Sequence, residues 1–120
     1  MGTRSNIGIL NEDGTVDYIY CHWDGYISHN GKILNEYYSE EASVWGLIAA
    51  GDMSTLGATL SECKFYDNGE MAERVTYRDY TKEHFESHVY LFTPGKGWEV
   101  RMYGDDFWTD LNKALETMEI

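Results

Sequence analysis

The chain has 120 residues, of which 21 are acidic and 9 are basic, so its formal net charge at neutral pH is −12. Hydrophobic residues make up 42% and aromatic residues 15%, which is enough for a hydrophobic core and excludes a disordered acidic tail. No apolar run is long enough to span a membrane and no secretory leader is present, so we expect a single domain over residues 1–120 without membrane contact.

The first predicted unit is a β-hairpin. Residues 5–10 place Ile7 and Ile9 on one face of a strand, and Asp13-Gly14 follows as a typical hairpin turn before a second strand over residues 16–23. Alternation divides the second strand into a core face and an opposite face: Ile19, Cys21 and Trp23 against Tyr18, Tyr20 and His22.

The middle of the chain is predicted to be mainly helical at first. A short helix is expected over residues 31–38, and a second helix is expected to be capped by Ser39 and to end at Gly51. Residues 52–87 carry the weakest pattern: residues 56–60 can form a turn or a short helical piece, and residues 63–66 and 74–80 can form short edge strands.

A second hairpin and a closing helix complete the prediction. Residues 88–93 and 98–103 read as strands joined by a Pro-Gly turn, and Asp105 or Asp106 is expected to cap the last helix. The apolar stripe of that helix is predicted to be Phe107, Trp108, Leu111, Ala114, Leu115 and Met118. The fold class is therefore α+β, a mainly antiparallel sheet of two hairpins with helices packed on one face.

Charge and cysteine content limit the partners and the compartment. The negative charge is divided evenly between the two halves of the chain, so it repels nucleic acid and suits either simple solubility or a basic partner. Cys21 and Cys63 do not make a disulfide framework, and Cys21 is expected to be a core residue. We therefore expect reduced thiols and a cytoplasmic protein.

One candidate for chemistry is the pair His22 and Asp24. Two residues apart on one strand face, they can form a general base, and the first hairpin could bring Ser5 close as a nucleophile. A single His-x-Asp pattern is a weak signal, and the simpler alternative is favoured: His22 hydrogen-bonds locally and Asp24-Gly25 forms a turn.

Metal and phosphate sites have little support. His84 and His88 are four residues apart, but His88 is better placed in a strand, and no zinc or phosphate-binding motif occurs. Four arginines could converge on an anion, although pairing with the abundant carboxylates is favoured: Arg4, Arg74, Arg78 and Arg101.

The ten tyrosines are the most unusual feature of the composition. Tyr18, Tyr20, Tyr90 and Tyr103 are predicted to line the sheet face opposite the helices, together with His22, His88 and Arg101. Such a face is either a binding surface or an ordinary sheet face that is partly exposed to solvent, and the two alternatives have equal support.

Several segments resemble a group of small bacteriophage and prophage proteins. The resemblance lies in residues 3–7 (TRSNI), 20–26 (YCHWDGY) and 30–34 (NGKIL), and extends to residues 47–57, residues 90–92 and Trp98. Members often have proline where this chain has Ile27, and an Arg-Asp-Arg-Gly-like segment where it has residues 78–81. The resemblance implies a phage setting and no particular reaction.

Two functions are therefore expected. The first is a phage accessory protein that binds and inhibits or redirects a host protein with a basic surface, for example a defence or nucleic-acid-handling protein. The second is a binder of a nucleotide-like small ligand, or a minor enzyme, that uses Arg4, Ser5, His22 and Asp24. The candidate binding residues are Arg4, Ser5, Tyr18, Tyr20, His22, Asp24, Tyr90 and Arg101. The sequence favours binding over catalysis and predicts no cofactor or metal. A module that assembles through its tyrosine face is a third alternative.

Overall fold

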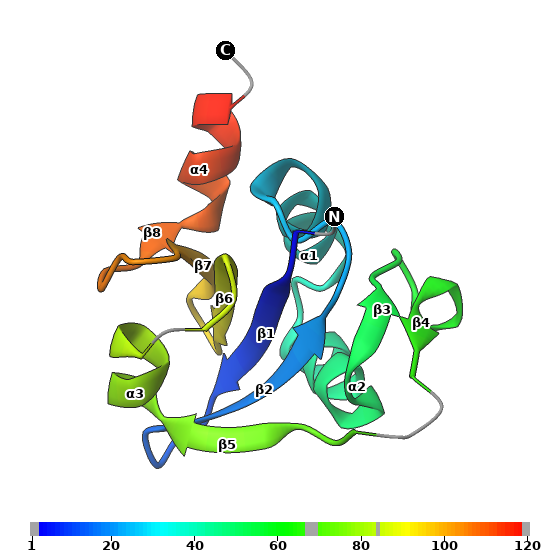
Figure 1. The fold of residues 1–120 in the computed structure, drawn as a ribbon, viewed down its shortest axis with the longest axis horizontal. Helices are drawn as coiled ribbons and strands as arrows, with labels where there is room; N and C mark the ends of the chain where they lie inside the picture. The colour runs from blue at the N-terminus through cyan, green and yellow to red at the C-terminus, as the bar shows by residue number, and fades with distance from the viewer. Residues whose placement is uncertain (1–2, 67–69, 84, 119–120) are drawn as a thin grey trace.

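The computed structural model describes residues 3–66, 70–83 and 85–118, and Figure 1 shows their fold. The strands are β1 (Ser5–Leu10), β2 (Thr15–Cys21), β3 (Met53–Thr55), β4 (Lys64–Phe65), β5 (Glu73–Thr76), β6 (His88–Thr93), β7 (Gly97–Met102) and β8 (Thr109–Asp110). The α-helices are α1 (Lys32–Tyr37), α2 (Glu41–Ala50), α3 (Tyr77–Lys82) and α4 (Leu111–Met118), with a π-helical turn at Ile27–Gly31 and a 3₁₀ turn at Leu60–Glu62. None of the helices described is both long and apolar enough to cross a membrane.

The described strands form one mixed sheet in the order β4-β3-β2-β1-β6-β7-β8, with β5 also pairing with β2. Both predicted hairpins are confirmed, since β1 pairs with β2 and β6 pairs with β7 in antiparallel fashion. The α+β class is confirmed as well. Most pairings are antiparallel, as expected, but the sheet is mixed, because β1 and β6 are parallel, as are β2 and β3, and it contains further strands beyond the two hairpins. Turn signals predict a hairpin locally, whereas the contact between two hairpins depends on residues far apart in the chain.

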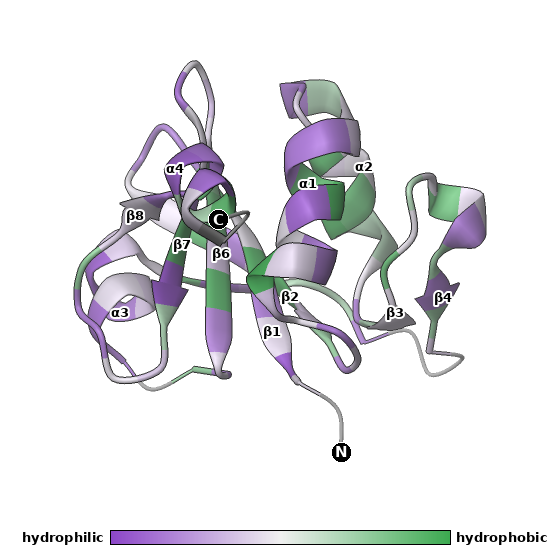
Figure 2. Cartoon of the chain, turned by 90° about the horizontal axis from the view of Figure 1, so that it is seen from above, coloured by the Kyte–Doolittle hydropathy of each residue, from purple (hydrophilic) through white to green (hydrophobic). Residues whose placement is uncertain are grey.

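The main core lies between the sheet and helices α1, α2 and α4. Ile7, Ile9, Ile19 and Cys21 face it from the first hairpin, as alternation predicts, and meet helix residues such as Leu47. In Figure 2, α1 and α2 lie together on one side of the sheet. This burial of apolar surface is the main source of stability for a domain of this size.

The opposite face of the sheet is covered at one end by α3. Tyr80 of α3 packs with Val16, Val89 and Leu91 in a second buried cluster, and its hydroxyl donates to the Tyr90 carbonyl at 2.8 Å. Helices therefore cover parts of both faces, which corrects the prediction that they lie on one face only. The prediction missed α3 because it assigned residues 74–80 to a strand, whereas β5 ends at Thr76 and the Thr76 hydroxyl caps the new helix.

The helix ends differ from prediction in two places. Glu40, not Ser39, precedes the first residue of α2, while Gly51 ends that helix with φ +89° as expected. Helix α4 begins at Leu111, and Asp110 rather than Asp105 or Asp106 accepts from a first-turn amide, that of Lys113.

The stripe expected on the last helix is confirmed only in part. Leu111, Ala114 and Leu115 pack against the main core. Phe107 is exposed and Trp108 joins the second cluster, because the chain runs through a turn and β8 before α4 begins. The side chain of Met118 lies outside the described residues.

Two predictions concern short elements in the middle of the chain. The edge strand expected over residues 63–66 is present as the short β4, beside β3. The helical piece expected over residues 56–60 lies slightly later, at Leu60–Glu62.

Gly8 is the position at which a side chain would most disturb this arrangement. A Cβ atom there would lie 2.8 Å from Val16 Cγ1 and 2.9 Å from the Tyr80 hydroxyl. We expect Gly8→Ala to lower the free energy of unfolding by about 1–3 kcal/mol, measured by urea denaturation. Gly46→Ala is the matched control, because a Cβ there meets only Leu60 Cδ1 at 3.7 Å, and helix propensity favours a gain of about 0.5–1 kcal/mol. Equal stability of the Gly8 variant and the wild type would contradict the close packing of Tyr80 on β1.

Candidate binding site

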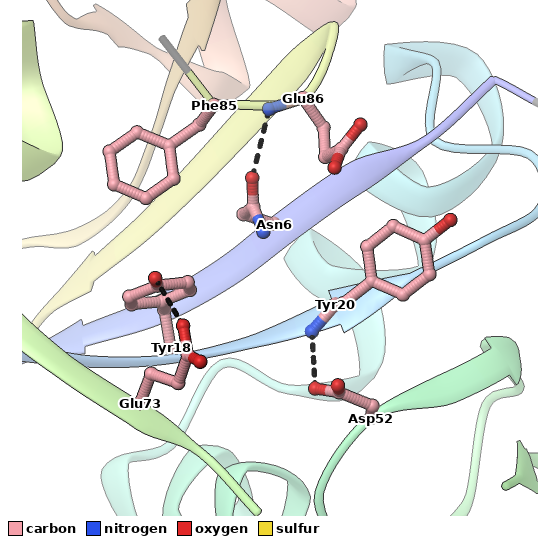
Figure 3. A pocket seen from close by; sticks show the side chains of 7 residues that line it. All are labelled: Asn6, Tyr18, Tyr20, Asp52, Glu73, Phe85 and Glu86. Carbon is pink, nitrogen blue, oxygen red and sulfur yellow. Dashed lines mark hydrogen bonds between the residues drawn. The ribbon is translucent and has the colours of Figure 1, made fainter. Parts of the chain in front are cut away.

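A pocket of about 370 Å³ opens on the sheet face that α3 covers only in part. It is lined by Asn6, Tyr18, Tyr20, Asp52, Glu73, Phe85 and Glu86. Figure 3 shows that these side chains come from β1, β2, the start of β3, β5 and the segment before β6. Five segments of the chain therefore contribute to one concave site.

The pocket exists because the outer edge of β2 is shared between two strands. Residues Thr15–Tyr18 pair with β5, and Cys21 pairs with β3, which leaves the backbone around Tyr20 between the two partners. There the Asp52 carboxylate accepts a hydrogen bond from the Tyr20 amide at 2.9 Å. A side chain thus satisfies a strand amide that would otherwise lack a backbone partner, and β3 and β5 diverge around the opening.

Aromatic side chains form one wall of the pocket. The Tyr18 ring meets Phe85 edge to face, with centroids 5.2 Å apart, and its hydroxyl donates to Glu73 at 2.7 Å. Burial, and then this hydrogen bond to Glu73, raise the pKa of Tyr18 well above its ordinary value. The phenol therefore remains protonated at any physiological pH and holds the Glu73 carboxylate in place.

Asn6 lies on the floor of the pocket and is only 5% exposed. Its Oδ1 accepts from the Glu86 amide at 3.0 Å, which fixes the orientation of the carboxamide. The Nδ2 group consequently has two N–H donors without an acceptor among the residues described. Among the described residues, the buried side-chain polar atom without a partner is Arg101 Nε, so Asn6 Nδ2 is not cut off from solvent. It opens to the pocket, where a ligand or water can accept from it.

The electrostatics of the pocket are strongly negative. Within residues 3–66, 70–83 and 85–118, the ion pairs join Asp24 with His29, Asp17 with Arg74 and Glu99 with Lys96, so none neutralises Asp52, Glu73 or Glu86. Burial raises the pKa of Asp52, and the charges of Glu70 and Glu73 raise it further, against the hydrogen bond from Tyr20. A bound cation would relieve this repulsion.

Beside the pocket, Tyr20 near the end of β2 forms an aromatic rim with His22 and Trp23, which follow the strand. The Tyr20 hydroxyl and His22 Nδ1 are 2.6 Å apart, and the His22 and Trp23 rings meet edge to face at 4.6 Å. Trp23 is 43% exposed, which corrects the prediction that it faces the core with Ile19 and Cys21. The strand β2 ends at Cys21, so its alternation does not extend to residue 23. Exposed aromatic area next to a charged pocket is typical of protein contact surfaces.

Four of the predicted binding residues lie at or near this site. Tyr18 and Tyr20 line the pocket and His22 belongs to the rim, on the sheet face that alternation predicts. Arg4 is exposed, and its positive charge opposes the rise that burial causes in the pKa of Tyr20, so it lies close by.

Ser5 and Asp24 do not join them. Ser5 is fully buried opposite Cys21 on the core face and hydrogen-bonds weakly with the Asn30 amide, so the predicted role as nucleophile for His22 is wrong. Asp24 adopts φ +57° and lies beside the Tyr26 hydroxyl and His29, which is the turn that the simpler alternative describes. His22 bonds to Tyr20 instead, as that alternative also expects.

The prediction also placed Tyr90 and His88 on the wrong face. Tyr90 is fully buried in the main core, its hydroxyl donates to the Gly25 carbonyl at 2.6 Å, and the His88 ring stacks on it. Because β6 is a central strand, both of its faces are buried, and the apolar pair Val89 and Leu91 faces α3 rather than the main core.

Arg101 faces away from the main core as predicted, but no ligand can reach it. Its side chain is 2% exposed and donates to the backbone carbonyls of Tyr80, Glu83 and Asp105. It therefore holds the end of α3 against the sheet. Tyr103, also predicted on the open face, is exposed beyond the end of β7.

The remaining candidates behave as structural residues. Arg74 makes a bidentate pair with Asp17, which agrees with the favoured alternative of carboxylate pairing, and Arg78 is exposed on α3. Cys21 is a buried core residue, as predicted, and burial raises its pKa to about 11. Both cysteines are free, and the described residues contain no cluster of three potential metal ligands. His84 lies outside the described residues.

Sequence reasoning missed five residues of the pocket: Asn6, Asp52, Glu73, Phe85 and Glu86. Asn6 had a usable signal, since it is a polar residue that alternates with Ile7 and Ile9 on the same predicted strand. The other four belong to residues 52–87, whose pattern is too weak to assign a face.

No protein-family model, curated protein or solved structure matches this chain.

The raised pKa of Asp52 predicts a pH-dependent effect on stability. The folded state binds the Asp52 proton more tightly than the unfolded chain, so ionisation costs stability above the folded pKa, and the cost vanishes below the ordinary value of 3.8. Asp52→Asn keeps an oxygen for the Tyr20 amide. We expect it to raise the Tm at pH 7 and to give no gain at about pH 3, as measured by thermal unfolding.

Asp17→Asn is the control of opposite sign. The hydrogen bond from Arg74 lowers the pKa of Asp17, so its contribution is present above pH 3.8 and is lost as the pH falls through the folded pKa. This variant should lower the Tm at pH 7 and lose its effect in acid. A lower Tm at pH 7 for Asp52→Asn would contradict the electrostatic strain assigned to the pocket.

Proposed function

We propose that this chain is a binding protein that docks on a basic surface of a partner protein through the acidic pocket and the aromatic rim. The observation that carries the proposal is the set of three pocket carboxylates, Asp52, Glu73 and Glu86, which have no basic partner among the described residues. A basic partner would supply the missing positive charge, and the net charge of −12 would speed its association.

The aromatic rim supports a protein as the partner. Tyr20, His22 and Trp23 present apolar area with polar groups attached, the kind of surface that supplies the central contacts of protein interfaces. Nucleic acid is disfavoured, because phosphates would face the pocket carboxylates.

The resemblance to small phage proteins gives the proposal its biological setting. We propose that the partner is a host protein, met in the host cytoplasm, and that binding inhibits or redirects it. A host protein that handles nucleic acid is a suitable candidate, since its basic cleft is complementary to this acidic face.

The alternative of a nucleotide-like ligand or a minor enzyme has weaker support. It requires Arg4, Ser5, His22 and Asp24 in one site, whereas Ser5 faces the core and Asp24 lies beside His29. The Arg101 side chain, which would assist with an anion, is bound to backbone carbonyls.

Affinity capture with matched variants tests the proposed docking face. The pocket variant Asp52→Asn/Glu73→Gln/Glu86→Gln and the control Glu12→Gln/Glu36→Gln/Glu116→Gln remove the same charge, and the control residues are exposed outside the pocket. We expect the wild type and the control to retain the same basic host protein at low salt, and the pocket variant to retain less than about a tenth as much. Equal capture by the pocket variant would refute the docking face, and so would a partner without a basic surface.

A further inference from the structure

We propose that the acidic pocket receives one arginine side chain from an extended segment of the partner, whose backbone carbonyl accepts a hydrogen bond from Asn6. This inference rests on the proposed function and names the group that the pocket recognises.

The carboxylates surround the opening from different sides. Glu73 comes from β5, Asp52 from the start of β3 and Glu86 from the segment before β6, and in Figure 3 they lie around the rings of Tyr18 and Tyr20. A guanidinium group has five N–H donors spread in a plane and can address several carboxylates at once, whereas an ammonium group is a single point of charge.

The walls also favour guanidinium. Phe85, Tyr18 and Tyr20 line the pocket, and a guanidinium plane stacks on aromatic rings while its edge donates to carboxylates. The stem of an arginine is apolar and can lie along the same rings. The volume of about 370 Å³ is within the range of ligand sites and suits a single side chain.

The floor of the pocket offers a hydrogen-bond donor to a second kind of group. Asn6 Nδ2 is a donor without an acceptor among the described residues, and its orientation is fixed by the bond from the Glu86 amide to Oδ1. An arginine side chain has only donors, so it cannot satisfy Asn6. A peptide carbonyl next to the side chain can, which makes an arginine within a peptide a better ligand than a free guanidinium ion.

The test is a pair of peptides that differ in charge alone. Acetylated and amidated Gly-Arg-Gly and Gly-citrulline-Gly are titrated into ¹⁵N-labelled wild-type protein, and NMR follows the Asn6 side-chain amide and the Tyr20 backbone amide. We expect saturable shifts of both signals with the arginine peptide and at least about tenfold weaker binding of the citrulline peptide, because a neutral urea cannot compensate the carboxylates. Methylguanidinium should shift the Tyr20 signal but not the Asn6 side-chain signal, since it brings no carbonyl.

Matched variants locate the effect. Glu73→Gln and Glu86→Gln keep the side-chain length and should each weaken the arginine peptide about threefold to tenfold. Glu12→Gln removes one exposed charge elsewhere and should leave the affinity unchanged within error. Retained ¹⁵N spectra of the variants would show that each one is folded.

The outcomes separate this inference from the proposed function. Equal binding of the citrulline peptide, tighter binding of a Gly-Lys-Gly peptide, or absence of binding by all peptides would overturn the arginine assignment. If the pocket variant still lost the host protein in the capture experiment, the proposed docking face would be supported even though the arginine assignment had failed. Arginine-specific binding combined with equal capture by the pocket variant would uphold the assignment and refute the docking face.

Discussion

The packing of the Tyr80 ring on the bare backbone of Gly8 is the contact on which the exposed half of this protein depends. Because residue 8 has no side chain, the ring lies directly against β1 and its hydroxyl reaches the Tyr90 carbonyl. Arg101 donates hydrogen bonds to the carbonyls of Tyr80, within α3, and of Glu83, just after it. These bonds fix the direction in which the chain leaves the helix. The next residues, Phe85 and Glu86, are thereby placed over β1 and β2 as one wall of the pocket.

This arrangement divides one face of the sheet into two regions with different chemistry. Under α3 the face is apolar and buried, with Val16, Val89 and Leu91 around Tyr80. Beyond Phe85 it becomes polar, and carboxylates gather around an asparagine whose amide lacks a protein partner. Unpaired charges that are partly buried are costly, and functional sites are places where proteins retain them.

Much of the local structure could be predicted from the sequence, because its signals are local. Asp13-Gly14 and the Pro-Gly turn place the two hairpins, and alternation places Ile7, Ile9 and Cys21 in the core. The parallel contact between β1 and β6 could not be predicted, since no turn encodes it. That contact buries both faces of β6, so alternation alone does not determine whether Tyr90 or Val89 and Leu91 face the main core.

The binding site was predictable only on the strand that carries Tyr18 and Tyr20. Its acidic members come from short elements after α2, where two- to four-residue strands such as β4 and β5 are too brief for a periodic pattern. Their positions follow from tertiary contacts: β5 pairs with β2 at Thr15–Tyr18, and Asp52 takes the place of a backbone partner beside Tyr20. Sequence patterns of one strand do not contain this information.

The parallel pairing of β1 with β6 has a consequence for synthesis of the protein on the ribosome. Ser5 pairs with His88 and Ile9 with Phe92, so the central ladder joins segments separated by most of the chain. Until residues 88–92 have left the exit tunnel, the nascent first hairpin has one unsatisfied edge and an uncovered apolar surface. Non-local contacts of this kind slow folding, so the sheet is completed only after the C-terminal part of the chain has been synthesised.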